Sequence, residues 1–296
     1  MHQHTIDTSR LRVGYEEHHP QGRRTVVLLH GWPDSLRTWD GVAPGLAAQG
    51  WRVIVPALRG FLPTRFLHAD TPRSGQLSAL GRDLLEFIDA LELQQPALVG
   101  HDWGARAAAN ACGLRPGVAS HLAMLAVGYG TNLPSQALDM AQVRRYWYHW
   151  FMATPLGERT LREQRQAFAR TMWDTWAPPG WYTDAEFDAA AAAFAHDDWP
   201  AVSAHSYSHR WGHAPGDPAY DDDEARLNPA PVLDLPTLVL HGQEDAVNPP
   251  EMSASKEGFF RGRYQRQLMP GVGHFPQREA PQAVLALLSD FLSQTG

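Results

Sequence analysis

The sequence predicts an α/β protein with a mostly parallel sheet, helices on both faces and an inserted all-helical segment. The first observation is that short, almost continuously apolar runs alternate with longer helical stretches. Such runs are typical of parallel strands that are covered on both faces. The second observation is that this alternation stops over residues 130–228 and then resumes. Strands that alternate with helices form a sheet through right-handed crossovers, which gives the predicted class.

The elements of the predicted sheet can be placed in order along the chain. The predicted strands are 25–29, 52–56, 97–100, 122–127, 237–240 and 265–269. The predicted helices are 36–49, 76–91, 103–112 and 281–292, the last of which opens with a proline, a residue favoured in a first helical turn.

Residues 130–228 show no strand pattern and are rich in tryptophan and alanine. We expect a helical cap domain here, between two parts of the core at 1–129 and 229–296. Ligand sites in open α/β sheets lie at the carboxyl ends of the strands, so a cap at that edge would enclose a pocket. The aromatic rings are compatible with an internal core or with contacts in a homodimer. The acidic run 221–224 is expected to be a solvated loop.

Composition excludes several classes of function. The 296 residues carry a formal net charge of −7, which argues against a nucleic-acid partner. No apolar run reaches the ~18 residues of a membrane span, and the first residues lack an apolar signal core. Cys112 is the single cysteine, which suits a cytoplasmic protein, and we expect it to be a small core residue. No phosphate-binding glycine loop or metal-ligand spacing occurs, so neither a cofactor nor a metal is expected.

Asp102 is the candidate nucleophile. It lies between strand 97–100 and helix 103–112, and Gly100 and Gly104 flank it at the spacing of a nucleophile elbow. That position normally holds serine, but the chain contains no G-x-S-x-G. A carboxylate can attack a carbon electrophile and form an ester on itself. The alternative is that Asp102 only caps the helix.

His274 is the candidate base that would activate water to cleave such an ester. It follows strand 265–269, and Asp245, which follows strand 237–240, could hold its imidazole in the required tautomer. The order nucleophile, acid, histidine is typical of hydrolytic triads on α/β sheets. The alternatives are a buried structural histidine for His274, and a turn residue for Asp245 with Glu244 as the acid.

The loop after strand 25–29 is the candidate oxyanion site. It reads His30-Gly31-Trp32-Pro33, and we expect the backbone N–H groups of Trp32 and Trp103 to hold the oxyanion. The Trp32–Pro33 bond is a candidate cis peptide bond. His30 and Pro33 are expected to line the substrate pocket.

Four motifs resemble the α/β-hydrolase superfamily in its branch with an aspartate nucleophile, which contains epoxide hydrolases and haloalkane and haloacetate dehalogenases. The motifs are His30-Gly31-Trp32-Pro33-Asp34-Ser35, Arg59-Gly60-Phe61, Gly100-His101-Asp102-Trp103-Gly104 and Gly273-His274-Phe275.

Within that branch, an aromatic residue at the position of Trp32 resembles epoxide hydrolases, whereas haloalkane dehalogenases often have Asn or Glu there. The resemblance implies two cap tyrosines that protonate the epoxide oxygen. Tyr148 and Tyr207 match them, with Tyr146 as a competitor for the first place. The alternative for both tyrosines is packing in an aromatic core.

Other residues resemble haloacetate dehalogenases. Arg106 stands where those enzymes have one of two arginines that grip the substrate carboxylate, but Trp103 replaces the other. His149, Trp150 and Tyr207 resemble their halide cradle. The alternative for Arg106 is an ion pair with a neighbouring acid.

The sequence therefore predicts an enzyme that opens a small apolar epoxide, or a related alkylating substrate, to a vicinal diol through an ester on Asp102. A haloacid dehalogenase with Arg106 on the carboxylate is the first alternative. A hydrolase-like protein that binds a ligand without turning it over is the second.

Overall fold

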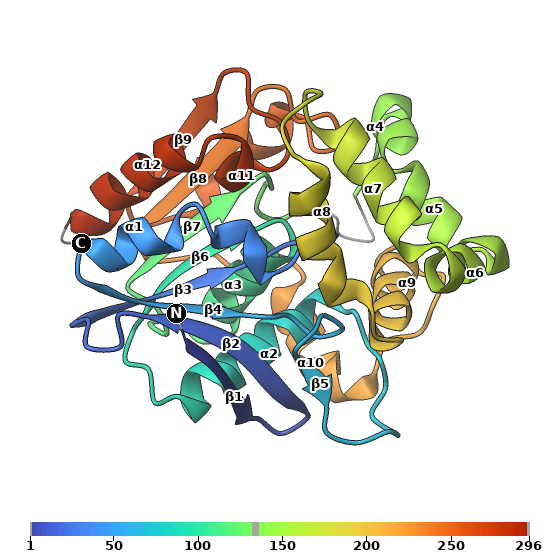
Figure 1. Cartoon of the computed structure of the whole chain (residues 1–296), viewed down its shortest axis with the longest axis horizontal. Helices are drawn as coiled ribbons and strands as arrows, with labels where there is room; N and C mark the ends of the chain where they lie inside the picture. The colour runs from blue at the N-terminus through green and yellow to red at the C-terminus, as the bar shows by residue number, and fades with distance from the viewer. Residues whose placement is uncertain (1, 132–135, 295–296) are drawn as a thin grey trace.

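The computed structural model describes residues 2–131 and 136–294, whose strands form a single sheet (Figure 1). The strands are β1 (His2–Asp7), β2 (Leu11–His18), β3 (Arg24–Leu29), β4 (Trp51–Pro56), β5 (Arg65–Phe66), β6 (Ala97–His101), β7 (His121–Leu125), β8 (Thr237–Gly242) and β9 (Tyr264–Met269). They lie in the order β1-β2-β4-β3-β6-β7-β8-β9, and β5 pairs with β2. All pairings from β4 to β9 are parallel, whereas β2 pairs antiparallel with β1, β4 and β5.

The six predicted strands are confirmed within two residues at each end, but β1, β2 and β5 were missed. β2 carries Glu16 and Glu17, which interrupt the apolar run that marks a buried strand. Both carboxylates are buried because arginines pair with them, Arg52 at 2.5 Å from Glu17 and Arg37 from Glu16. This strand is therefore buried through ion pairs, and the apolar run by which a buried strand is recognised in a sequence is absent.

Helices cover both faces of the sheet. They are α1 (Ala43–Ala48) and α12 (Pro281–Ser293) on one face, and α2 (Leu77–Ala90) and α3 (Trp103–Leu114) on the other. Successive strand residues face opposite sides. In β3, Val27 and Leu29 pack with the α2 and α3 layer, and Val26 and Leu28 pack with the α1 and α12 layer.

The predicted single helix 36–49 is wrong. A short 3₁₀ helix, η1 (Leu36–Trp39), is followed by a turn and then by α1. Pro44 lies in the first turn of α1. Proline lacks the N–H that a helix interior needs and is tolerated at a helix start, so the second helix begins anew at this point.

The segment between β7 and β8 is helical in its described part. Its helices are α4 (Met140–Arg145), α5 (Trp147–Met152), α6 (Pro155–Glu163), α7 (Arg165–Trp176), α8 (Asp184–Ala191), α9 (Asp198–Arg210) and α10 (Asp221–Leu227). Figure 1 shows α4 to α9 gathered at one end of the sheet. Trp173 of α7 donates its indole N–H to Pro33 O (2.9 Å), just after β3. The inserted helices therefore pack on the carboxyl ends of the strands.

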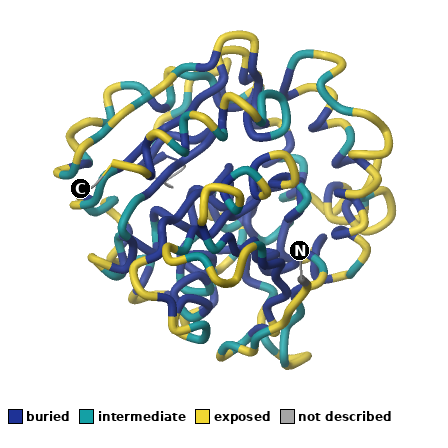
Figure 2. Tube along the Cα trace, turned by 60° about the vertical axis from the view of Figure 1, so that its left-hand side comes forward, coloured by how far each residue is buried: buried dark blue, intermediate teal, exposed yellow. Residues whose placement is uncertain are grey.

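The aromatic rings of this segment mostly form an internal core. Trp173, Trp199 and Tyr207 belong to the same buried cluster as Trp32 of the loop after β3 and Trp103 of α3. Trp147, by contrast, is 42% exposed. Figure 2 shows the central strands buried and the outer turns exposed. Among the helices of residues 2–131 and 136–294, none has the length and apolarity needed to cross a bilayer.

The acidic run 221–224 is not the solvated loop that we expected. It forms the first turn of α10, where carboxylates face the positive end of the helix dipole. Asp223 pairs with Arg82 of α2 (2.5 Å), and Glu224 accepts a hydrogen bond from Ser78 (2.5 Å). Helix α10 is therefore bound to α2 by its own acidic residues.

Candidate active site

Three polar residues meet where three parallel strands end. Asp102 follows β6, Asp245 follows β8 and His274 follows β9. His274 Nδ1 lies 2.8 Å from Asp245 Oδ2, and His274 Nε2 lies 4.0 Å from Asp102 Oδ2. The carboxyl ends of parallel strands share one edge of a sheet, so residues far apart in the chain converge there.

Asp102 occupies a sharp turn between β6 and α3. Its backbone has φ 47° and ψ −112°, a conformation that is rare for residues with a side chain. The turn requires glycine at its flank, because a Cβ on Gly104 would lie 2.4 Å from the backbone oxygen of Leu29. The Asp102 side chain makes no capping hydrogen bond to α3, so the helix-cap alternative does not account for it.

The loop after β3 holds the Asp102 carboxylate. The Trp32 N–H donates to Asp102 Oδ1 at 3.0 Å, and the Trp32–Pro33 peptide bond is cis. The Trp103 amide is the first of α3 and therefore has no acceptor within the helix. These are the two N–H groups that the sequence proposed for an oxyanion.

His30 contacts its own loop and the residues after β4, whereas the Pro33 carbonyl contacts Trp173 of α7. His30 Nδ1 lies 3.0 Å from Gly31 O, and its Nε2 accepts from the Leu58 N–H at 3.0 Å. Burial lowers the pKa of His30 to about 4, so the ring is neutral and Nδ1 carries the proton. These bonds use both ring nitrogens to fix the loop, and neither is left for a substrate.

Asp245 is ionised although it is buried. Burial raises its pKa, but His274 and His241 outweigh burial and bring the pKa to about 2. Its Oδ1 accepts the backbone N–H groups of Val247 (3.0 Å) and Asn248 (2.8 Å). Glu244 is exposed, so it does not share this environment.

His274 responds to that charge. Burial lowers its pKa, but Asp245, Asp102 and Glu279 together raise it by more, so the pKa lies above the usual 6.5. With Nδ1 on Asp245, the buried Nε2 faces Asp102 and has no hydrogen-bond partner among the described residues. An imidazole held in this way can accept a proton at Nε2.

Tyr148 of α5 and Tyr207 of α9 lie together above the loop after β3. Their ring centroids are 5.2 Å apart, and the Tyr148 ring stacks on Trp32 at 5.7 Å. Trp103 Nε1 donates to the Tyr207 hydroxyl oxygen (3.1 Å), which leaves the Tyr207 O–H free to donate elsewhere. Burial raises the pKa of both tyrosines well above 10, so both are protonated. Tyr146 instead donates its O–H to Asn248 Oδ1 (2.9 Å).

The structure brings His149 to this group but not the indole N–H of Trp150. The His149 ring lies 4.4 Å from the Tyr207 ring, whereas the Trp150 N–H donates to Val143 O (3.0 Å). Trp211, which the sequence analysis did not single out, donates to His149 Nδ1 (3.0 Å) and so places the His149 proton on Nε2. The sequence holds no signal for this contact, because Trp211 and His149 lie on different parts of the chain.

Arg106 is buried on α3 and donates to Thr131 O (3.0 Å) and Thr131 Oγ1 (3.3 Å). The hydrogen-bond partners of its guanidinium are all atoms of Thr131, so the alternative of an ion pair with a neighbouring acid is not found within the described chain.

Two further residues position the candidate base. His101 Nε2 lies 2.7 Å from His274 O, and burial lowers the pKa of His101 to about 4, so the neutral ring donates this bond. The carbonyl of Trp176 accepts the His274 N–H at 3.2 Å. His101 could have been suspected from its place beside Asp102, whereas Trp176 has no signal in the sequence.

Comparison with known proteins finds relatives along nearly the whole chain. The family described as alpha/beta hydrolase fold matches residues 24–281. Epoxide hydrolase A of Mycobacterium tuberculosis is 24% identical over 97% of this chain and 96% of its own length. A crystal structure from Klebsiella pneumoniae subsp. pneumoniae MGH 78578 has a TM-score of 0.94 and 35% identity, covering 99% of this chain and 97% of that one. A fluoroacetate dehalogenase of a Burkholderia species is 30% identical over 44% of this chain and 42% of its own length.

Proposed function

The chain belongs to the alpha/beta hydrolase fold family, and within it we propose that the protein is an epoxide hydrolase that forms an ester on Asp102. The observation that carries the proposal is one carboxylate that accepts a backbone N–H from Trp32 and faces a free imidazole nitrogen, with two protonated tyrosines packed on Trp32 and Trp103 beside it. The near full-length relative named Epoxide hydrolase A supports the same reaction.

The first step is alkylation. Asp102 Oδ2 attacks an epoxide carbon, and the carbon–oxygen bond of the ring breaks. Tyr148 and Tyr207 hydrogen-bond the epoxide oxygen, and one of them donates its proton as negative charge develops there. The buried, uncharged phenols suit this role because they donate without placing a net charge beside Asp102.

The second step is hydrolysis of the ester. His274 Nε2 takes a proton from water, which attacks the ester carbonyl, and Asp245 stabilises the imidazolium that forms. The Trp32 N–H already contacts Asp102 Oδ1, and with the Trp103 N–H it would hold the oxyanion. The diol leaves, and the proton released by ester hydrolysis restores the tyrosine. In this proposal residues 130–228 are a cap that supplies both tyrosines, and no cofactor takes part.

The experiment is an intact-mass measurement on His274→Gln after exposure to styrene oxide, 1,2-epoxyhexane and fluoroacetate. Loss of the base should strand the ester, so the protein should gain the mass of a whole epoxide. Adding Asp102→Ala to the same variant should abolish the gain. An epoxide adduct that persists without Asp102 would contradict the mechanism.

The other two candidate functions are separate outcomes of this experiment. A gain equal to fluoroacetate minus hydrogen fluoride would indicate a haloacid dehalogenase. The Trp150 N–H is already bonded to Val143 O, which weakens the halide cradle that this alternative needs. No adduct from any compound, together with tight binding of an epoxide, would indicate a ligand-binding protein.

A further inference from the structure

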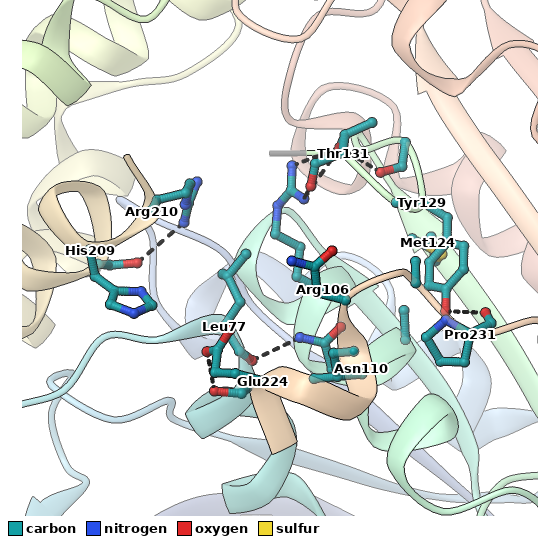
Figure 3. A pocket seen from close by; sticks show the side chains of 18 of the residues that line it. Leu77, Arg106, Asn110, Met124, Tyr129, Thr131, His209, Arg210, Glu224 and Pro231 are labelled. Atoms are coloured by element: carbon teal, nitrogen blue, oxygen red, sulfur yellow. Dashed lines mark hydrogen bonds between the residues drawn. The ribbon is translucent and has the colours of Figure 1, made fainter. Parts of the chain in front are cut away.

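A buried pair of arginines lies next to the candidate active site without a counter-charge. Arg106 of α3 is 7% exposed and Arg210, the last residue of α9, is 5% exposed. The two side chains lie on the wall of the same cavity (Figure 3). A guanidinium remains protonated in proteins, so both groups are cationic.

Neither arginine forms an ion pair within residues 2–131 and 136–294. Arg106 binds Thr131, and Arg210 donates to Ser206 Oγ (3.2 Å). Nε of each side chain is buried and has no hydrogen-bond acceptor in the described chain. Residues 132–135 read Asn-Leu-Pro-Ser and so contain no acid. Two buried charges without a partner are costly, which favours a site that an anion completes.

Both arginines line a cavity of about 300 Å³, which is at the small end of ligand pockets. Figure 3 shows the two guanidinium groups on the upper side of this space and Glu224 on its lower side, near Leu77. Glu224 is held by Ser78, so an anion belongs at the arginine side. Much of the remaining lining is apolar: Leu77, Ala109, Met124, Tyr129, Leu227 and Pro231.

The arginine pair also lies beside one of the proposed reacting groups. Arg106 stands one helical turn after Asp102, since its backbone N–H donates to the Asp102 backbone oxygen (3.1 Å). The Arg210 guanidinium lies over the Tyr207 ring, 4.7 Å from its centroid. An anion on this pair would therefore lie close to Tyr207, and the substrate must extend from there to Asp102.

We propose that Arg106 and Arg210 together bind the carboxylate of an epoxide-bearing acid, so that the preferred substrate is an epoxy carboxylate. This inference rests on the proposed function. Two guanidinium groups offer planar N–H pairs that match a carboxylate. The apolar walls suit the hydrocarbon part of such a molecule.

The test compares ω-epoxy carboxylates of increasing chain length with their primary amides, which have nearly the same shape but no charge. For the best chain length, kcat/KM of the wild type should favour the acid over the amide by about tenfold or more. In Arg210→Met this ratio should fall to near one, and Arg210→Lys should restore part of it. The ratio does not depend on the fraction of folded protein, because both substrates are measured on one preparation.

Arg144→Met is the matched control. Arg144 is exposed on α4, so the substitution removes the same charge without touching the cavity, and the ratio should stay at the wild-type value. Hexanoate, a carboxylate without an epoxide, serves as a binding probe that needs no turnover. It should raise the Tm of the wild type but not that of Arg210→Met.

The outcomes separate the two proposals. Equal hydrolysis of acid and amide by the wild type would overturn the carboxylate subsite and leave the epoxide hydrolase intact. Equal hydrolysis with stabilisation by hexanoate would mean that the pair binds a free carboxylate instead of the substrate. Hydrolysis of neither compound, with styrene oxide still hydrolysed, would overturn the substrate assignment alone, and loss of all epoxide hydrolysis would overturn both proposals.

Discussion

Replacing Asp245 with asparagine should stop the reaction at the ester, for a reason that can be traced to individual atoms. Asp245 Oδ1 accepts two backbone N–H groups, from Val247 and Asn248. In Asp245→Asn the amide oxygen must keep that place, so the NH₂ group faces His274 Nδ1. The His274 proton is then forced onto Nε2, and the nitrogen that faces Asp102 can no longer accept a proton.

The expected loss of rate in Asp245→Asn can be given a lower and an upper bound. The site lowers the pKa of Asp245 from 3.8 to about 2, and this shift corresponds to roughly 2 kcal/mol, or a few tens-fold. The wrong tautomer adds to that loss. In a serine protease triad the same substitution costs about 10⁴ in kcat. We therefore expect the hydrolytic step to slow by about two to four orders of magnitude.

The assay measures both steps in one variant. Stopped-flow or quenched reaction with styrene oxide, followed by intact mass, should show ester formation at nearly the wild-type rate and slow release of diol. Glu244→Gln is the control, because Glu244 is exposed beside Asp245 and should have no effect. Asp245→Asn turnover within tenfold of the wild type, or a loss in Glu244→Gln instead, would refute the reasoning.

Four further outcomes are expected. Tyr207→Phe and Tyr148→Phe should each slow ester formation by about 10²-fold or more, because a general acid contributes at least that much. Single-turnover mass measurements would show this loss, and an unchanged rate would count against the tyrosine pair. Turnover should fall as the pH drops, because protonated His274 cannot accept a proton. The midpoint should lie above 6.5 because the pKa of His274 is raised, and a midpoint below 6.5 would contradict the pairing with Asp245. The Cys112 thiol should resist iodoacetamide in the native protein at mildly alkaline pH and react after unfolding, because burial raises its pKa to about 12. Gly104→Ala should lower the free energy of unfolding by about 1–3 kcal/mol in a denaturant titration, because the alanine Cβ would clash with backbone that cannot move aside. An unchanged midpoint would argue against the turn geometry.

The parallel part of the sheet was predictable because its signal is local. Val26 to Leu29 are all apolar, and alternate residues serve the two helical layers, so the run itself indicates a strand covered on both faces. β2 gave no such signal. In the sequence Glu16 and Glu17 indicate exposed positions. In the structure they are buried, because arginines from other elements pair with them.

The sequence by itself determined where Asp102, Asp245 and His274 stand in the chain, each just after a strand. Parallel strands present their carboxyl ends at one edge, so this order was enough to predict that the three would converge. It did not decide which cap side chains join them. Tyr146 and Tyr148 lie two residues apart, and only the packing of α5 and of its junction with α4 directs one side chain to Asn248 and the other to Trp32.

The same holds for contacts between distant elements. Trp211 donates a hydrogen bond to His149, and Arg210 lines the same cavity as Arg106, across separations that no local pattern encodes. Side-chain direction in these cases follows from how α9 packs on α3 and α5, which is a property of the assembled core. Local periodicity therefore determines the helices, the strands and their junctions, and tertiary packing determines which side chains contact one another at the site.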